Sequence, residues 1–138
     1  MYKPWKPFGE LVKGDWPGFD LTIKGRSLTV TRHVWRDRTC ISGMRLNFQH
    51  VAGFYLIDES VEVTSNYSPL PPEFDNSDAT WRGCEMWVEE NSTRIELYGE
   101  LGKVNYERLN SYYMVGQEVV LVIAGREPTV SELPASSL

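Results

Sequence analysis

Apolar and polar residues alternate along much of this chain with the period of two that is typical of β-strands. Residues 19–24 and 28–35 both alternate, and Gly25 and Arg26 stand between them, which predicts a β-hairpin. A second hairpin is predicted around residues 90–92. The same criteria predict further strands, which cover residues 44–49, 51–57, 60–64, 85–89, 93–98, 104–106, 112–115 and 118–124.

The spacing of these strands, about ten residues from one to the next, predicts the fold class. We expect a mainly β protein, an antiparallel meander that forms a sandwich or a partly open barrel, with at most one or two short helices. The whole chain, residues 1–138, is expected to be a single domain. Residues 103–113 are the best candidate for a helix, but their apolar positions fit neither period, so their structure stays open.

The apolar phase of the predicted strands gives the expected core. Residues 118–124 are almost continuously apolar, which favours a strand buried on both faces. Residues 68–78 are rich in proline and acidic residues and cannot continue a ladder, so they predict a long surface loop. The side chains expected to be buried are Leu21, Ile23, Leu28, Val30, Leu46, Phe48, Leu97, Val120 and Val122.

With 138 residues, 41% apolar and 24% charged, the chain has the composition of a soluble globular domain that can build one sizeable core. Its apolar runs are far shorter than the roughly twenty residues that span a bilayer, and its first residues lack the pattern of a secretory signal. We therefore expect a cytoplasmic protein that does not bind membranes. Cys40 and Cys84 lack the paired spacing of zinc ligands and are expected to be buried free thiols.

The net charge of −5 is unevenly distributed along the chain. Residues 1–50 carry a balance of +5, residues 51–100 carry −9, and the remaining residues carry −1. An acidic protein is a poor candidate for nucleic acid as its main ligand, despite a local group of arginines. An acidic region of this kind suits a basic partner surface. The arginines in question are Arg32, Arg36, Arg38 and Arg45.

Motifs of known catalytic chemistry are missing from the sequence: it has no G-x-S-x-G elbow, no P-loop and no H-E-x-x-H. Its two histidines, His33 and His50, fall in predicted strands or their turns, where a lone histidine is more often a packed or surface residue than a metal ligand. Glu85, Glu89 and Glu96 are interpreted as a solvated strand face rather than a pair of catalytic carboxylates. The sequence therefore predicts a protein that is not an enzyme and holds no metal or cofactor.

Aromatic residues are abundant, with five Trp and seven Tyr. Half-buried Trp and Tyr are expected in β-cores, and the same residues anchor protein interfaces. Tyr112 and Tyr113 belong to a stretch rich in Tyr and Asn, which is typical of adaptable contact surfaces. Trp81 adjoins the acidic loop and is expected to be exposed.

One segment resembles a known family. Residues 44–56 contain Leu46-x-Phe48, a short turn, Val51, and a second strand that carries the aromatic Phe54. This order resembles a pattern in small β-rich bacterial immunity proteins of polymorphic toxin systems. The resemblance covers about half the chain and departs at residues 68–78. It implies a cytoplasmic, non-enzymatic inhibitor that binds and blocks a cognate toxin.

Together these observations predict a protein-binding face in the acidic region, with a cognate toxin as its partner. The alternative is a small β-barrel that binds a ligand, or an enzyme, with a pocket lined by aromatic residues. The sequence does not set the oligomeric state. The residues predicted to contact the partner are Asp58, Glu59, Glu73, Asp75, Asp78, Trp81, Tyr112 and Tyr113.

Overall fold

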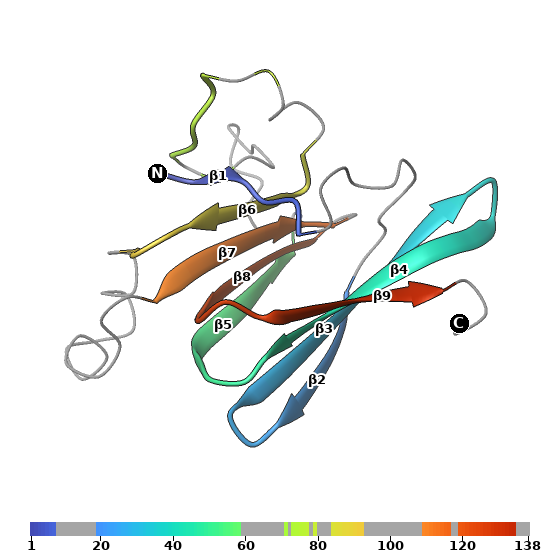
Figure 1. The fold of residues 1–138 in the computed structure, drawn as a ribbon, viewed down its shortest axis with the longest axis horizontal. Coiled ribbons are helices and arrows are strands. Elements are labelled where there is room, and N and C mark those ends of the chain that lie inside the picture. Colours follow the sequence, from blue (N-terminus) through green and yellow to red (C-terminus); the bar gives the residue numbers. More distant parts are fainter. Residues whose placement is uncertain are drawn as a thin grey trace.

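The computed structural model describes residues 1–7, 19–58, 71, 73–77, 79, 84–92, 109–116 and 119–134. These residues form nine β-strands in two antiparallel sheets, and none of them forms an α-helix (Figure 1). The prediction of a mainly β, antiparallel fold is confirmed. The sheets do not close into a barrel, so the arrangement is that of a sandwich.

Five strands form the larger sheet, in the spatial order β1-β6-β7-β8-β5. Among the described strands, β1 and β5 are therefore its two edges. The strands are β1 (Lys3–Pro4), β5 (Val51–Asp58), β6 (Met86–Glu89), β7 (Asn110–Val115) and β8 (Val119–Gly125).

Four strands form the smaller sheet, in the order β2-β3-β4-β9. They are β2 (Asp20–Lys24), β3 (Ser27–Arg36), β4 (Thr39–Phe48) and β9 (Thr129–Pro134).

Two-residue turns join the first strands of the smaller sheet. The predicted β2–β3 hairpin is confirmed, because Lys24 opposes Ser27 across the turn. Gly25 has a φ of +61°, the left-handed conformation that glycine adopts without steric cost. In the β3–β4 turn both central residues, Asp37 and Arg38, have positive φ, as hairpin turns that follow the twist of their strands require.

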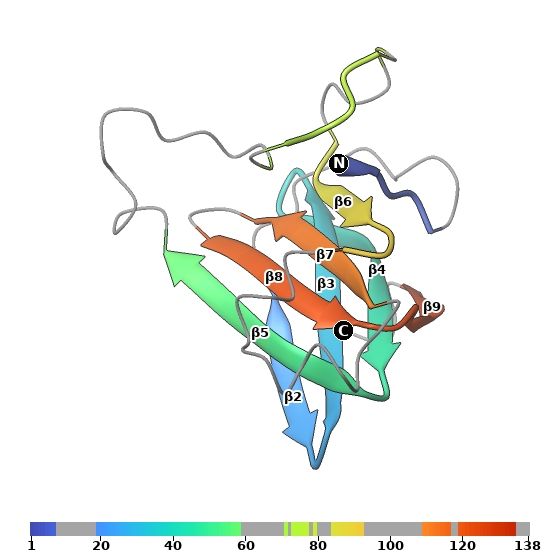
Figure 2. The same cartoon turned by 90° about the vertical axis from the view of Figure 1, so that its left-hand side faces the viewer.

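A bent ribbon of two antiparallel arms connects the sheets. One arm is β4 followed by β5, and the other is β8 followed by β9. Asn47 opposes Thr129, and four residues further along each arm Val51 opposes Gly125, so the register is continuous across the bend. Ala52 then forms a bulge, because Val51 and Gly53 oppose consecutive residues of β8. Each arm passes from one sheet to the other, which makes the corner of the sandwich (Figure 2).

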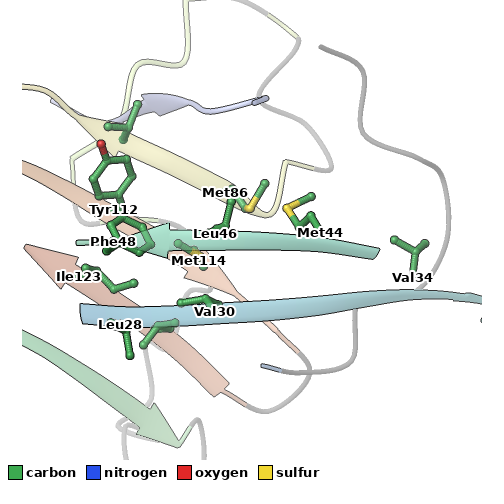
Figure 3. Close-up of a cluster of buried hydrophobic side chains, with 12 residues drawn as sticks. Leu28, Val30, Val34, Met44, Leu46, Phe48, Met86, Tyr112, Met114 and Ile123 are labelled. Atoms are coloured by element: carbon green, nitrogen blue, oxygen red, sulfur yellow. The ribbon is translucent and has the colours of Figure 1, made fainter. Parts of the chain in front are cut away.

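The core lies between the sheets and consists of interdigitated side chains from both inner faces (Figure 3). On β3 every second residue from Leu28 to Val34 is buried, as a half-buried strand requires. β8 is buried along nearly its whole length, which confirms the prediction from its apolar run. The buried cluster contains Leu28, Val30, Val34, Met44, Leu46, Phe48, Met86, Val88, Tyr112, Met114, Leu121 and Ile123.

Most of the predicted core residues are buried as expected. Leu21 is partly buried against the core, and Leu97 lies outside the described residues. The prediction for Ile23 is wrong: this side chain is 60% exposed, although its cross-strand partner Leu28 is buried. Ile23 lies beside the turn on an edge strand, and alternation gives a residue's face but not how far the core extends across the sheet. The confirmed residues are Leu28, Val30, Leu46, Phe48, Val120 and Val122.

Several other predictions concern parts of the chain that are not described. The predicted strands at 60–64, 93–98 and 104–106 lie outside the described residues, and the strand at 93–98 is the second strand of the hairpin predicted around residues 90–92. The sequence left the structure of residues 103–113 open, and residues 110–113 of this segment belong to β7. The first and last strands of the chain, β1 and β9, were not predicted.

Candidate functional site

The acidic turn, residues 73–77, is held against the N-terminal end of the chain (Figure 2). The amide of Tyr2 donates to the carbonyl oxygen of Glu73 at 2.8 Å, and the amide of Asp75 donates to the carbonyl oxygen of Tyr2 at 2.6 Å. Tyr2 and Phe74 thus form a parallel bridge outside the regular strands. This segment belongs to the predicted surface loop, and the two hydrogen bonds fix its backbone.

Aromatic packing supports the same anchor. Tyr2 is 2% exposed, and its hydroxyl lies 2.5 Å from that of Ser111 on β7. The ring of Phe74 packs edge-on against that of Trp87, which is fully buried on β6, with 5.3 Å between the ring centroids. The acidic turn is therefore attached to the larger sheet by its backbone and by a side chain.

The two carboxylates of the acidic turn, those of Glu73 and Asp75, belong to exposed residues. The Asp75 carboxylate accepts hydrogen bonds from the amide of Ser77 at 2.9 Å and from its hydroxyl at 2.6 Å. These bonds favour the charged form and hold the pKa of Asp75 below its ordinary value. Asp75 is therefore ionised at neutral pH, and its side chain is fixed by a local turn.

The structure brings Glu73 and Asp75 together but separates them from Asp58. Asp58 ends β5, at the edge of the larger sheet opposite β1, whereas the acidic turn is bonded next to β1. Glu59, Asp78 and Trp81 lie outside the described residues.

Tyr112 is not a contact residue, so its assignment to the partner-binding face is wrong. It is 1% exposed, and its ring packs at 4.9 Å from that of Trp5 and 5.1 Å from that of Phe48. Its hydroxyl accepts a hydrogen bond from the amide of Asn110. Burial raises the pKa of Tyr112 to about 12. Tyr113 points the other way because side chains alternate along β7; it is half-buried, with its ring 5.7 Å from that of Tyr2.

The carboxylates of β6 and its ends are engaged within the protein. Glu89 is 7% exposed, so its interpretation as a solvated strand residue is wrong. Its carboxylate lies 2.6 Å from the Met1 amino group and accepts a hydrogen bond from the hydroxyl of Ser92. Lys3 lies 3.1 Å from Glu90, which follows the strand. The N-terminal residues therefore offset part of the negative charge beside the acidic turn.

Arg32 is a second charged residue whose burial the sequence did not predict. It is 1% exposed, lies on the inner face of β3 and donates to the carbonyl oxygen of Val115 at 2.7 Å. Its guanidinium stands 4.5 Å from the centre of the Phe19 ring and 3.6 Å from the Glu85 carboxylate. Burial lowers the pKa of Arg32 to about 10, and Glu85 partly opposes that shift. The group of arginines expected from the sequence is thus divided, with one member in the interior.

The two cysteines are unpaired, as expected, but half-buried rather than fully buried. The Cys40 thiol donates to the carbonyl oxygen of Ser42 and the Cys84 thiol to that of Met86. Burial raises the pKa of Cys84, which makes its thiolate scarce at neutral pH. In the part of the chain that the structure describes, no group of three or more His, Cys, Asp or Glu side chains could hold a metal ion.

One further structural finding and three comparisons with known proteins complete the description. Among the described residues no helix is long and apolar enough to cross a membrane. No protein-family model matches the sequence, and comparison with curated proteins and with solved structures gave no match.

Proposed function

We propose that this chain is a non-enzymatic binding protein whose acidic turn docks on a basic surface of another protein. The observation that supports the proposal is the position of Glu73 and Asp75, which are exposed on a backbone held by two hydrogen bonds from and to Tyr2. A binding loop that is already ordered loses less conformational entropy when its partner docks.

The charge of the region favours rapid association with a basic partner. Residues 51–100 carry a balance of −9, and opposite potentials on two proteins raise the rate of encounter. Salt screens such attraction over about 8 to 10 Å at physiological ionic strength. The association rate is therefore expected to fall as the salt concentration rises.

More specifically, we propose that the partner is a toxin and that the chain is its immunity protein in the bacterial cytoplasm. The support for this step is the resemblance of residues 44–56 to immunity proteins of polymorphic toxin systems, together with the acidic region. A toxin that acts on nucleic acid needs a basic active site, which an acidic turn can cover.

Charge reversal of the acidic turn tests the proposal. The wild-type chain serves as bait to capture a stoichiometric partner from cells of its source, and the association rate of the purified pair is then measured. We expect Glu73→Lys with Asp75→Lys to slow association at low salt by about tenfold or more. The matched control is Asp20→Lys with Glu132→Lys, which changes the net charge equally on the two edge strands of the smaller sheet.

Each step has a result that would contradict it. Equal association rates for the wild type and the Glu73/Asp75 variant would refute docking through the acidic turn, provided that circular dichroism shows both to be folded. The toxin hypothesis requires that expression of the captured partner alone stops growth and that co-expression of this chain restores it. A partner without that effect would refute the toxin assignment and leave the binding function in place.

A further inference from the structure

The hairpin of β3 and β4 extends beyond both of its neighbours in the smaller sheet. In the described part of the chain, β2 pairs with β3 only as far as Thr31, and β9 pairs with β4 only as far as Ser42. The end of this hairpin, the hairpin tip (residues 35–39), is exposed at every position. In Figure 1 the hairpin tip lies on the right, away from the larger sheet, and the acidic turn lies at the upper left. The two surfaces are therefore separate.

Trp35 is the large apolar side chain of the hairpin tip. It follows the buried Val34, so alternation along β3 places it on the outer face of the sheet, where it is 40% exposed. β4 has one extra residue at this point, because Val34 opposes Ser42 and Trp35 opposes Cys40. That extra residue, Ile41, packs against the core. The bulge thus fills the core beside the hairpin tip, while Trp35 stays in solvent.

Arg38 has a backbone conformation that is unfavourable for its residue type. Its φ is +65°, and that of the preceding Asp37 is +51°. Two-residue turns of this kind favour Asn-Gly or Asp-Gly, because glycine adopts positive φ without steric cost and Asp tolerates it. A glycine at position 38 would therefore relieve the strain. Since strained backbone occurs mainly at functional sites, the arginine at this position indicates a role for its guanidinium.

The hairpin carries positive charge in a protein that is acidic as a whole. Residues 27–48 contain four Arg and one Asp, a balance of +3, whereas the net charge of the chain is −5. Arg32 is buried, but Arg36 and Arg38 are exposed on either side of Asp37 at the hairpin tip. Salt screens more distant charges beyond about 8 to 10 Å, so the local positive charge acts on a group docked here. Arginine binds carboxylates through two parallel hydrogen bonds, which makes an acidic partner the complementary one.

We propose that the hairpin tip binds an acidic segment of another protein, with an apolar side chain of that segment against Trp35 and a carboxylate on Arg38. Trp and Arg are among the residue types that contribute most to binding at protein interfaces. A short acidic segment meets the hairpin tip alone, whereas nucleic acid, a long polyanion, also meets the negative charge of the rest of the chain. The β3–β4 ladder already orders the tip, so docking costs little conformational entropy.

Selection from a library of random short peptides displayed on phage tests the proposal. The wild type is the target, and peptides that also bind the double variant Trp35→Ala, Arg38→Gly are removed. We expect the remaining peptides to be rich in Asp and Glu and to contain an apolar residue. One of them is then synthesised with a fluorescein label, and its dissociation constant is measured by fluorescence anisotropy.

Arg38→Gly separates binding from folding. It removes the guanidinium but suits the positive φ, so we expect a melting temperature at least equal to that of the wild type. The dissociation constant of the selected peptide should rise about tenfold or more in this variant, and by a similar factor in Trp35→Ala. The matched control is Arg26→Gly, which removes an exposed arginine from the turn at the other end of β3 and should leave the dissociation constant unchanged.

The acidic turn provides a second control. Glu73→Lys with Asp75→Lys should bind the selected peptide as the wild type does or more tightly, because the two surfaces are separate and the variant is less acidic. A peptide that this variant binds more weakly would belong to the acidic turn rather than to the hairpin tip.

Three further results would overturn the proposal. One is a selection that yields no peptide dependent on Trp35 and Arg38, and another is a set of selected peptides without an excess of acidic residues. The third comes from fluorescein-labelled oligothymidylate in the same assay. If it bound as tightly as the peptide and lost affinity equally in Arg38→Gly, the hairpin tip would be a nucleic-acid site instead.

Discussion

The guanidinium of Arg32 on one sheet donates a hydrogen bond of 2.7 Å to the carbonyl oxygen of Val115 on the other. Arg32 occupies an inward position of β3, between the buried Val30 and Val34. A charge at such a position is stable only when the opposite sheet supplies acceptors and a counter-charge, and Val115 and Glu85 supply them here. The contact is thus a polar link across an otherwise apolar core.

Removal of the link between Arg32 and Val115 should lower the free energy of unfolding. Arg32→Ala deletes the hydrogen bond to Val115 and leaves a cavity in place of a buried side chain, so we expect a loss of about 2 to 5 kcal/mol in the free energy of unfolding. Arg32→Met restores most of the side-chain volume and should lose less than Arg32→Ala. Urea denaturation followed by circular dichroism measures both values. Equal stability of the alanine variant and the wild type would contradict a structural role for the link.

Two aliphatic residues of the smaller sheet provide a paired test of the core. Leu46 is fully buried, and Leu46→Ala should cost about 2 to 5 kcal/mol because it leaves a cavity. Ile23→Ala removes a side chain that is 60% exposed and should cost about 0.5 kcal/mol or less. The same denaturation experiment compares the two. A larger loss for Ile23→Ala would place Ile23 in the core after all.

Gly43 should tolerate no side chain. A Cβ at this position would lie 2.8 Å from the carbonyl oxygen of Arg32 and 3.2 Å from the ring of His33. The Arg32 oxygen belongs to the backbone, so it cannot shift without a cost in free energy. Gly43→Ala should therefore lower the melting temperature clearly. Gly25→Asn is the control, because its site is open and Asn accepts positive φ. A melting temperature of Gly43→Ala equal to that of the wild type would show that the β3–β4 register differs.

Tyr112 should make the protein less stable at alkaline pH. Its pKa rises from 10.0 to about 12 on folding, so between these values the unfolded state loses its proton first and the folded state holds more protons. Stability contributed by this group is thus fully present below pH 10 and falls as pH rises toward 12, by at most about 3 kcal/mol. The difference between the wild type and Tyr112→Phe isolates the effect from that of Arg32, whose lowered pKa acts in the opposite direction. A difference that does not vary with pH above 10 would contradict it.

The strands in which apolar and polar residues alternate clearly could be predicted from the sequence. β9, which depends on its partner strand, could not. β3 and β4 alternate clearly, whereas in β9 the apolar residues Val130 and Leu133 are three positions apart, a spacing that no strand period gives. β9 forms because β4 offers it a ladder of hydrogen bonds. Pairing between distant segments is not visible in local periodicity.

For the candidate site, the residue types could be predicted from the sequence, but their surroundings could not. Tyr112 and Tyr113 alternate, so one of them had to face the core, and Met114 marks the inward phase that Tyr112 shares. The same phase argument applied to β3 assigns Arg32 to the interior. In contrast, no local pattern predicts the anchor of the acidic turn, because Tyr2 lies at the N-terminal end of the described chain, far from residues 73–77 in sequence.

The bent ribbon also has a consequence for how the chain folds. Asp58 opposes Val119 at one end of the ribbon and Ser42 opposes Pro134 at the other, so the β5–β8 end closes the shorter loop. Closing a long loop costs entropy before its contacts form, whereas each later pair extends an existing ladder. We therefore expect the two arms of the ribbon to pair first between β5 and β8. Pairing then proceeds through the corner, and β9 joins β4 last. Substitutions in β9 should then raise the unfolding rate while leaving the folding rate nearly unchanged.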